Sequence, residues 1–237
     1  MSGTLYLIPT PLWKGTERHG LPEHTLQTIR SIRCFVVEHP TRALGFLKWA
    51  GHPVPEHERV HRVLNKRTPD HEAYSLVGLL REGDVGYFSE AGAPGVADPG
   101  AVLVRFAHQA GHKVVPLVGP SSIVLALMAS GMNGQLFQFH GYAPVDSGPR
   151  CEKIRALERE SAKTGQTQIL IETPHRTVAL ARDILNTCAG STRFCMAAAL
   201  CSPGEWIRSA PVSEWEGVDV ETVKGLPAVY LLQAYTG

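Results

Sequence analysis

Short apolar runs alternate along the chain with segments whose apolar residues recur at helical spacing. The apolar runs predict strands at residues 4–8, 34–37, 59–64, 85–89, 113–117, 136–140, 168–171, 194–200 and 228–232. Helical spacing predicts helices at residues 23–31, 41–50, 70–82, 102–110, 121–130, 150–163 and 176–188. This alternation indicates an α/β fold with a mainly parallel sheet and helices on its faces.

Local signals set some of the boundaries. Thr41 is the expected N-cap of the second helix, Thr68 opens the third, and Asp98 is expected to cap the fourth. The polar stretch 142–149, which contains glycine and prolines, is the expected mobile loop.

Composition and charge narrow the function classes. With 237 residues the chain forms one large domain or two small ones, since a domain has roughly 100–200 residues. The net charge is only +1, so a contact with nucleic acid requires a local basic patch. Two segments, 59–67 and 150–163, carry several Arg and Lys each, although a solvated surface is their simpler interpretation.

The sequence also predicts a compartment. It has neither a secretory signal nor an apolar stretch long enough to span a membrane, so we expect a cytoplasmic protein without a membrane partner. The five cysteines are an odd number and include no C-x-x-C pair, which indicates free thiols and no structural zinc.

One metal motif occurs in the chain. His57-Glu58-Arg59-Val60-His61 matches H-E-x-x-H, in which two histidines on one helix face bind zinc. Prolines precede this segment, a strand-like run follows it, and its arginine would repel a cation. We therefore expect a chance match and no metal site, with a zinc hydrolase that uses His57, Glu58 and His61 as the alternative from another class.

Gly- and Pro-rich segments follow several predicted strands. Neither G-x-G-x-x-G, nor the P-loop, nor G-x-S-x-G occurs in the chain. Instead, the segments that follow predicted strands are 9–12, 89–100, 116–122 and 171–176. The carboxyl ends of parallel strands are where open α/β sheets bind ligands, so we expect a binding site there.

The same segments carry a family resemblance. GTLYLIPTPL, SEAGAPGVADPG, PLVGPSSIVLALMASG, FQFHGYAP and IETPHR resemble the tetrapyrrole methylase superfamily. Within it they are similar to the bacterial branch of small-subunit ribosomal RNA 2′-O-ribose methyltransferases I. The resemblance implies the two-domain fold of class III S-adenosylmethionine (SAM) methyltransferases, with domains at 1–118 and 119–237 and SAM in the interdomain cleft. It also implies a homodimer that methylates a ribose hydroxyl of RNA in a ribosomal subunit, or alternatively a small molecule such as a tetrapyrrole.

The resemblance extends to individual residues. The positions that it places at the cofactor are Pro11, Glu90, Ala91, Gly92, Pro94, Val96, Ser121, Ser122, Thr173, Ala198, Pro227 and Ala228. Glu172, His175 and Asp98 are the candidate catalytic bases, and Arg176 is expected to hold a phosphate of the acceptor. Alternatively, Asp98 only caps a helix, and the segment 172–176 is a salt-bridged helix start.

Two features depart from that branch. Glu90 stands where the branch commonly has aspartate. After Lys224-Gly225 the chain continues with Leu226-Pro227 and reaches Gly237, so we expect a short form without the branch's C-terminal extension.

Overall fold

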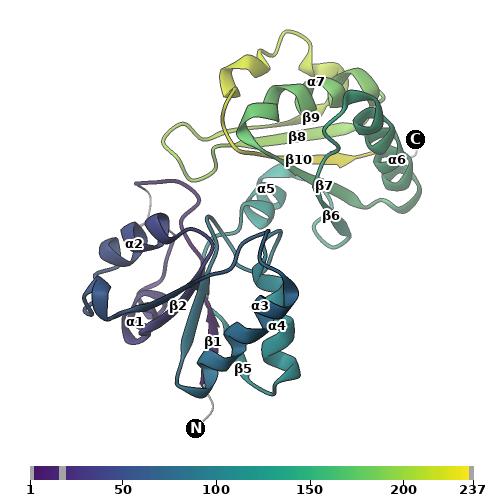
Figure 1. Ribbon diagram of the computed structural model, residues 1–237. Coiled ribbons are helices and arrows are strands. Elements are labelled where there is room, and N and C mark those ends of the chain that lie inside the picture. The colour runs from purple at the N-terminus through teal and green to yellow at the C-terminus, as the bar shows by residue number, and fades with distance from the viewer. Residues whose placement is uncertain (1–2, 16–19, 235–237) are drawn as a thin grey trace. The chain divides into compact units, whose positions relative to one another are not determined.

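The computed structural model describes residues 3–15 and 20–234, which form two compact units (Figure 1). Unit 1 is Met1–Ser121 and unit 2 is Ser122–Gly237. The family resemblance implies a division after residue 118.

Unit 1 contains a parallel sheet of five strands. They are β1 (Thr4–Leu7), β2 (Cys34–Val37), β3 (Val60–Val63), β4 (Val85–Phe88) and β5 (Lys113–Pro116). Their order is β3-β2-β4-β1-β5, and every neighbouring pair is parallel. The predicted α/β class is confirmed, and the carboxyl ends of all five strands share one edge of the sheet.

Helices cover both faces of this sheet because its strands alternate apolar side chains between two cores. The helical segments are α1 (Glu23–Ser31), α2 (Pro40–Trp49), η2 (Glu56–Glu58), α3 (Asp70–Ser75), η3 (Leu76–Arg81) and α4 (Gly100–Gln109). Phe35 and Val37 pack against α1 and α2. Val36, between them in sequence, packs on the opposite face against α3, η3 and α4.

Unit 2 contains a mixed sheet, which the sequence did not predict. Its strands are β6 (Phe137–Tyr142), β7 (Thr167–Glu172), β8 (Arg193–Ala198), β9 (Trp206–Pro211) and β10 (Ala228–Gln233), in the order β6-β7-β10-β8-β9. Only β6 and β7 pair in parallel, so the expected mainly parallel sheet is wrong for this unit. The short connection between β8 and β9 holds no crossover helix, and a parallel pair needs one.

The helical segments of unit 2 are α5 (Ser122–Ser130), α6 (Ser147–Thr164), η4 (Pro174–Arg176), α7 (Thr177–Thr187), η5 (Val212–Trp215) and η6 (Val220–Val223). Helices α6 and α7 share one core with the sheet, in which Phe194 stacks on Trp215 with ring centroids 4.5 Å apart. Helix α5 contacts β8, β9 and β10. No helix among the described residues is long and apolar enough to cross a membrane.

Several local predictions need correction. Helix α2 begins at Pro40, so Thr41 lies inside its first turn rather than at the cap. The helix expected over 70–82 is split into α3 and η3, and no side chain caps α3. Only residues 143–146 of the stretch 142–149 are irregular, since β6 runs to Tyr142 and α6 begins at Ser147.

Candidate functional site

In unit 1 the loops that follow β1, β4 and β5 meet at the carboxyl edge of the sheet. The backbones of Thr10 and Gly92 exchange two hydrogen bonds of 3.0 Å, which join the first two loops. Gly92 has φ +75°, a conformation that glycine adopts at little cost. A Cβ on Gly119 would lie 2.2 Å from Cγ of Pro9, so the third loop packs directly on the first. The edge therefore gathers the predicted positions Pro11, Glu90, Ala91, Gly92, Pro94, Val96 and Ser121.

Asp98 organises the loop after β4, residues 89–100. Its Oδ1 accepts hydrogen bonds from the backbone N–H of Gly100 at 2.7 Å and of Gly95 at 2.9 Å, and from the hydroxyl of Tyr87 at 3.2 Å. Burial raises the pKa of the Asp98 carboxyl, and the two backbone N–H donors oppose that rise. The N-cap residue of α4 is Pro99, and Asp98, one position earlier, supports the helix start by accepting from the N–H of Gly100, the first residue of α4. A role for Asp98 as base stays a prediction.

Charged side chains that the sequence interpretation missed lie beside Glu90. The Glu90 carboxylate pairs with Arg42 at 3.0 Å and with His39 at 3.6 Å. Burial raises the pKa of Glu38, and the nearby Glu90 and Asp98 carboxylates raise it further. Glu38 directly follows β2. The expectation that ligands bind at the carboxyl ends of parallel strands would therefore also have identified Glu38 as a candidate.

In unit 2 a second set of predicted positions meets at one edge of the mixed sheet. Ala228, the first residue of β10, pairs with Glu172 on β7 and with Ala198 on β8. The N–H of Ala199 donates to the carbonyl of Pro227 at 2.9 Å, and Thr173 directly follows Glu172. Ala199 has φ +49°, which is uncommon for a residue with a side chain and occurs often at functional sites.

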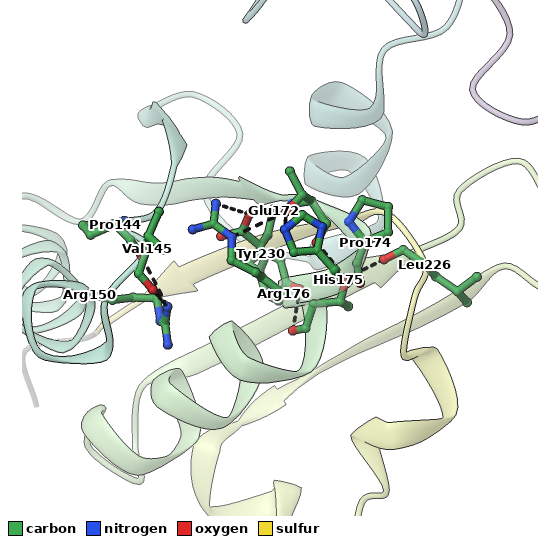
Figure 2. A network of polar contacts seen from close by, with 11 residues as sticks. Pro144, Val145, Arg150, Glu172, Pro174, His175, Arg176, Leu226 and Tyr230 are labelled. Atoms are coloured by element: carbon green, nitrogen blue, oxygen red, sulfur yellow. Dashed lines mark hydrogen bonds and ion pairs between the residues drawn. The ribbon is translucent and has the colours of Figure 1, made fainter.

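Glu172 is the centre of a buried polar network at this edge (Figure 2). Its side chain is fully buried, and Oε1 accepts from the backbone N–H of Thr173 at 2.6 Å and pairs with Nη2 of Arg176 at 2.7 Å. Glu172 Oε2 and Arg176 Nη1 are both buried without a hydrogen-bond partner in the described part of the chain. Each buried polar atom without a partner needs an explanation, and a bound ligand is one.

Two hydrogen bonds of Thr177 anchor the turn that carries His175 to Leu226 and to Tyr230 of β10. Thr177 Oγ1 donates to the carbonyl of Leu226 at 2.5 Å, and the Tyr230 hydroxyl donates to the carbonyl of Thr177 at 2.8 Å. His175 is exposed, and its Nε2 lies 3.3 Å from the Thr173 hydroxyl. The segment 172–176 is thus a salt-bridged helix start, as one alternative had it, and it presents an exposed imidazole.

Arg150 does not belong to a basic surface. It is buried, its Nε pairs with Asp183 at 2.6 Å, and its Nη1 donates to the carbonyls of Pro144 and Val145 (Figure 2). The predicted patch at 150–163 therefore loses its first member. Arg62, Lys66 and Arg67 of the other patch are exposed.

The H-E-x-x-H segment does not form the helix that zinc binding requires. His57 and Glu58 lie in the single turn η2, whereas His61 lies on β3. Among residues 3–15 and 20–234, no three His, Cys, Asp or Glu side chains are grouped to hold a metal ion. The zinc hydrolase alternative has no support in this geometry.

Comparisons with known proteins give consistent results. The chain is 32% identical to ribosomal RNA small subunit methyltransferase I of Vibrio cholerae, over 98% of this chain and 77% of the relative. Its identity with the same-named protein of Escherichia coli O157:H7 is 30%, over 94% and 75% of the two chains. No protein-family model matches the chain.

Solved structures support the fold. The methyltransferase CobJ superposes with a TM-score of 0.61 at 15% identity and covers 99% of this chain and 95% of its own. The precorrin-6Y methylase of Archaeoglobus fulgidus gives a TM-score of 0.60 at 16% identity, with coverage of 99% and 100%. At these identities the likeness concerns the fold, and that fold is the one implied by the sequence resemblance.

Proposed function

The chain belongs to the family of ribosomal RNA small subunit methyltransferase I and is therefore a methyltransferase, and from this membership we propose that it transfers a methyl group from SAM to ribosomal RNA. We propose a ribose 2′-hydroxyl as the acceptor, as the sequence resemblance implies. The observation that carries the proposal is the 32% identity over 98% of the chain.

Two observations on the described residues fit SAM as the cofactor. Ala91 is exposed and has only a methyl side chain, so a ligand can approach the backbone of loop 89–100 at this position. In unit 2, Glu172 Oε2 is a buried acceptor that suits a hydroxyl or ammonium donor of the cofactor. We propose that the predicted positions on both strand edges hold SAM. When bound, SAM supplies a methyl group already activated on a sulfonium, which leaves orientation and exclusion of water to the protein.

The acceptor hydroxyl has to lose a proton, and we propose His175 as the base. Of the three candidates, Glu172 is buried against Arg176, and Asp98 already accepts from two backbone N–H groups and a hydroxyl. His175 is exposed, and the Thr173 hydroxyl lies beside only one of its ring nitrogens, Nε2. Nδ1 is then the atom that takes the proton.

We propose that the main role of Arg176 is to form an ion pair with Glu172. Its Nη2 pairs with Glu172 Oε1, and its side chain is only 18% exposed, so little of the guanidinium reaches solvent. The positive charge of Arg176 balances the negative charge of the buried Glu172 carboxylate, and this stabilises the turn that carries His175. The expected contact with an acceptor phosphate stays a prediction.

The proposal is tested by methyl transfer in vitro. Tritiated SAM is incubated with the protein and with small ribosomal subunits from cells that lack it, and the modified nucleotide is mapped. We expect label on a ribose oxygen. Label absent from RNA but present on an added tetrapyrrole would overturn the RNA proposal in favour of the small-molecule alternative.

His175→Ala tests the proposed base. Because general-base catalysis contributes about 10²–10⁴-fold, we expect kcat to fall within that range while the Kd for SAM is unchanged. The control is His108→Ala, an exposed histidine on α4. An unchanged kcat in His175→Ala would rule out the proton transfer to this ring.

A further inference from the structure

A cavity of about 410 Å³ lies in unit 1, beyond the carboxyl end of β3. Two segments enclose it, residues 64–68 after β3 and residues 95–102, which lead from the β4 loop into α4, and α3 contributes to its wall. Its volume lies in the range of small-molecule sites, which is about 300–1,000 Å³. Among the residues predicted for the site only Asp98 lines the cavity, and Gly95 lies between two positions expected at the cofactor, so the cavity adjoins the cofactor positions without including them.

The walls of this β3 cavity suit a flat, weakly polar ring. Leu64, Ala73, Pro99 and Val102 present apolar surface to it. Ala97, also in the lining, is held at φ +59°, and residues in this strained conformation cluster at functional sites. The hydrogen bonds of Asp98 to the N–H groups on either side of Ala97 maintain that conformation.

The polar groups inside the cavity suit the edge of such a ring. The side-chain oxygen of Asn65, Oδ1, accepts a hydrogen bond from the backbone N–H of Arg67 at 2.9 Å. The side-chain nitrogen of Asn65, Nδ2, has no hydrogen-bond partner among residues 3–15 and 20–234. A side-chain N–H is therefore available beside the apolar walls. It suits a heterocycle that offers a hydrogen-bond acceptor.

Charge is distributed unequally between the interior and the mouth of the cavity. Asp98 lines the cavity wall, and Glu38 is close enough to interact with both Asp98 and Glu90. These carboxylates disfavour an inorganic or sugar phosphate inside. Lys66 at the mouth, together with the exposed Arg67, favours phosphate outside.

We propose that the β3 cavity binds the base of a nucleotide of the acceptor RNA, and that Lys66 and Arg67 bind the adjoining backbone phosphates. The inference rests on the proposed function and deepens it, because it locates the acceptor on unit 1. It also gives a role to the basic segment 59–67 that the sequence left as a solvated surface.

The first test is direct binding, without catalysis. AMP, GMP, CMP and UMP are titrated separately by saturation-transfer NMR against the wild type, Ala101→Trp and Gln109→Trp. Ala101 is an exposed α4 residue that lines the cavity, so tryptophan there fills it, while Gln109 lies exposed at the far end of the same helix. We expect at least one nucleotide to bind the wild type and Gln109→Trp, and Ala101→Trp to bind it at least tenfold more weakly.

Ribose 5-phosphate, which lacks the base, is expected not to bind. Binding of ribose 5-phosphate as strong as that of the nucleotides would overturn the proposal, because the site would then recognise phosphate. Equal nucleotide binding by Ala101→Trp and the wild type would also overturn it, as would no nucleotide binding to the wild type. The Tm of each variant confirms that it is folded.

The second test separates acceptor from cofactor. Ala101→Trp is expected to raise the KM for small ribosomal subunits at least tenfold and to leave the Kd for SAM unchanged. Lys66→Glu is expected to weaken RNA binding and its salt dependence, whereas Lys48→Glu, an equal charge change on α2, is not. Weaker SAM binding by Ala101→Trp would assign the cavity to the cofactor and overturn this inference alone. Failure of the wild type to methylate any RNA would instead overturn the proposed function.

Discussion

The two strand edges that carry the predicted site are built in different ways. In unit 1 the contacts that form the edge are mainly backbone contacts. Gly92 and Thr10 exchange backbone hydrogen bonds, and Gly119 packs on Pro9. The carboxylate of Asp98 also accepts hydrogen bonds from backbone N–H groups. In unit 2 the edge is made by side chains, with the Glu172–Arg176 pair fully or largely buried.

This difference decides how each edge tolerates change. A backbone-built edge is sensitive to added atoms, because a glycine at a close approach leaves no space for a Cβ. A side-chain-built edge is sensitive to lost partners, because a buried charge without compensation is costly. The following substitutions test that contrast.

The largest expected effect is on a second buried ion pair of unit 2, which joins Arg150 on α6 to Asp183 on α7 and tests the same sensitivity to a lost partner. Arg150→Met leaves the largely buried Asp183 without its cationic partner and with the Ser147 hydroxyl as a donor. Removing one partner of a buried ion pair typically costs about 3–5 kcal/mol. The free energy of unfolding is measured by denaturant titration with tryptophan fluorescence. Arg155→Met, an exposed position on the same helix, is the control and is expected to change stability by no more than about 0.5 kcal/mol. Equal effects in the two variants would contradict a structural role for the pair.

A smaller effect is expected from an added methyl group in unit 1. In Gly119→Ala the new Cβ would lie 2.2 Å from the rigid ring of Pro9, and overpacking of this kind costs about 1–3 kcal/mol. Gly45→Ala has open space inside helix α2 and is expected to stabilise by about 0.5–1 kcal/mol. Opposite signs of the two changes in free energy of unfolding support the backbone-built edge, and stabilisation by both would refute it.

Tyr87→Phe removes one hydrogen bond from the Asp98 centre. The hydroxyl donates at 3.2 Å, so we expect a loss of about 0.5–1.5 kcal/mol in the stability of unit 1. The backbone N–H donors to Asp98 remain, and the loop is expected to keep its conformation. The amide hydrogen-exchange rates of Gly95 and Gly100 check this expectation. If both rates rose to those of an unprotected loop, the Tyr87 hydroxyl, and not the backbone N–H groups, would be what fixes the position of Asp98.

The smallest effect is a pH dependence in unit 2. Burial lowers the pKa of His140, and the Lys153 charge lowers it further, while the hydrogen bond to Gln168 raises it. The unfolded chain, with a His pKa of about 6.5, then binds more protons than the native state just below that pH. Unit 2 therefore loses stability as the pH falls below about 6.5. His140→Gln is expected to flatten this slope in unfolding titrations at pH 5–7, and an unchanged slope would exclude the histidine.

The sequence predicted the edge of unit 1 better than that of unit 2 for a physical reason. Glycines and prolines after short apolar strands are local signals, and parallel order brings those strand ends together, as at Pro11 and Gly92. The pairing of Glu172, Ala198 and Ala228 depends on antiparallel contacts across long stretches of sequence, so the family resemblance alone gathered those residues. Arg150 was misjudged because its buried partner, Asp183, lies on another helix. Glu38 was missed although it too follows a strand.

The central claim is that SAM binds residues of both strand edges, and hydrogen-exchange mapping with and without SAM tests it most directly. We predict that saturating SAM slows exchange in segments of both units, at residues 10–12, 90–96 and 121–122 and at residues 172–173, 198–199 and 227–228. Protection confined to one unit, or no protection at millimolar SAM, would contradict the account.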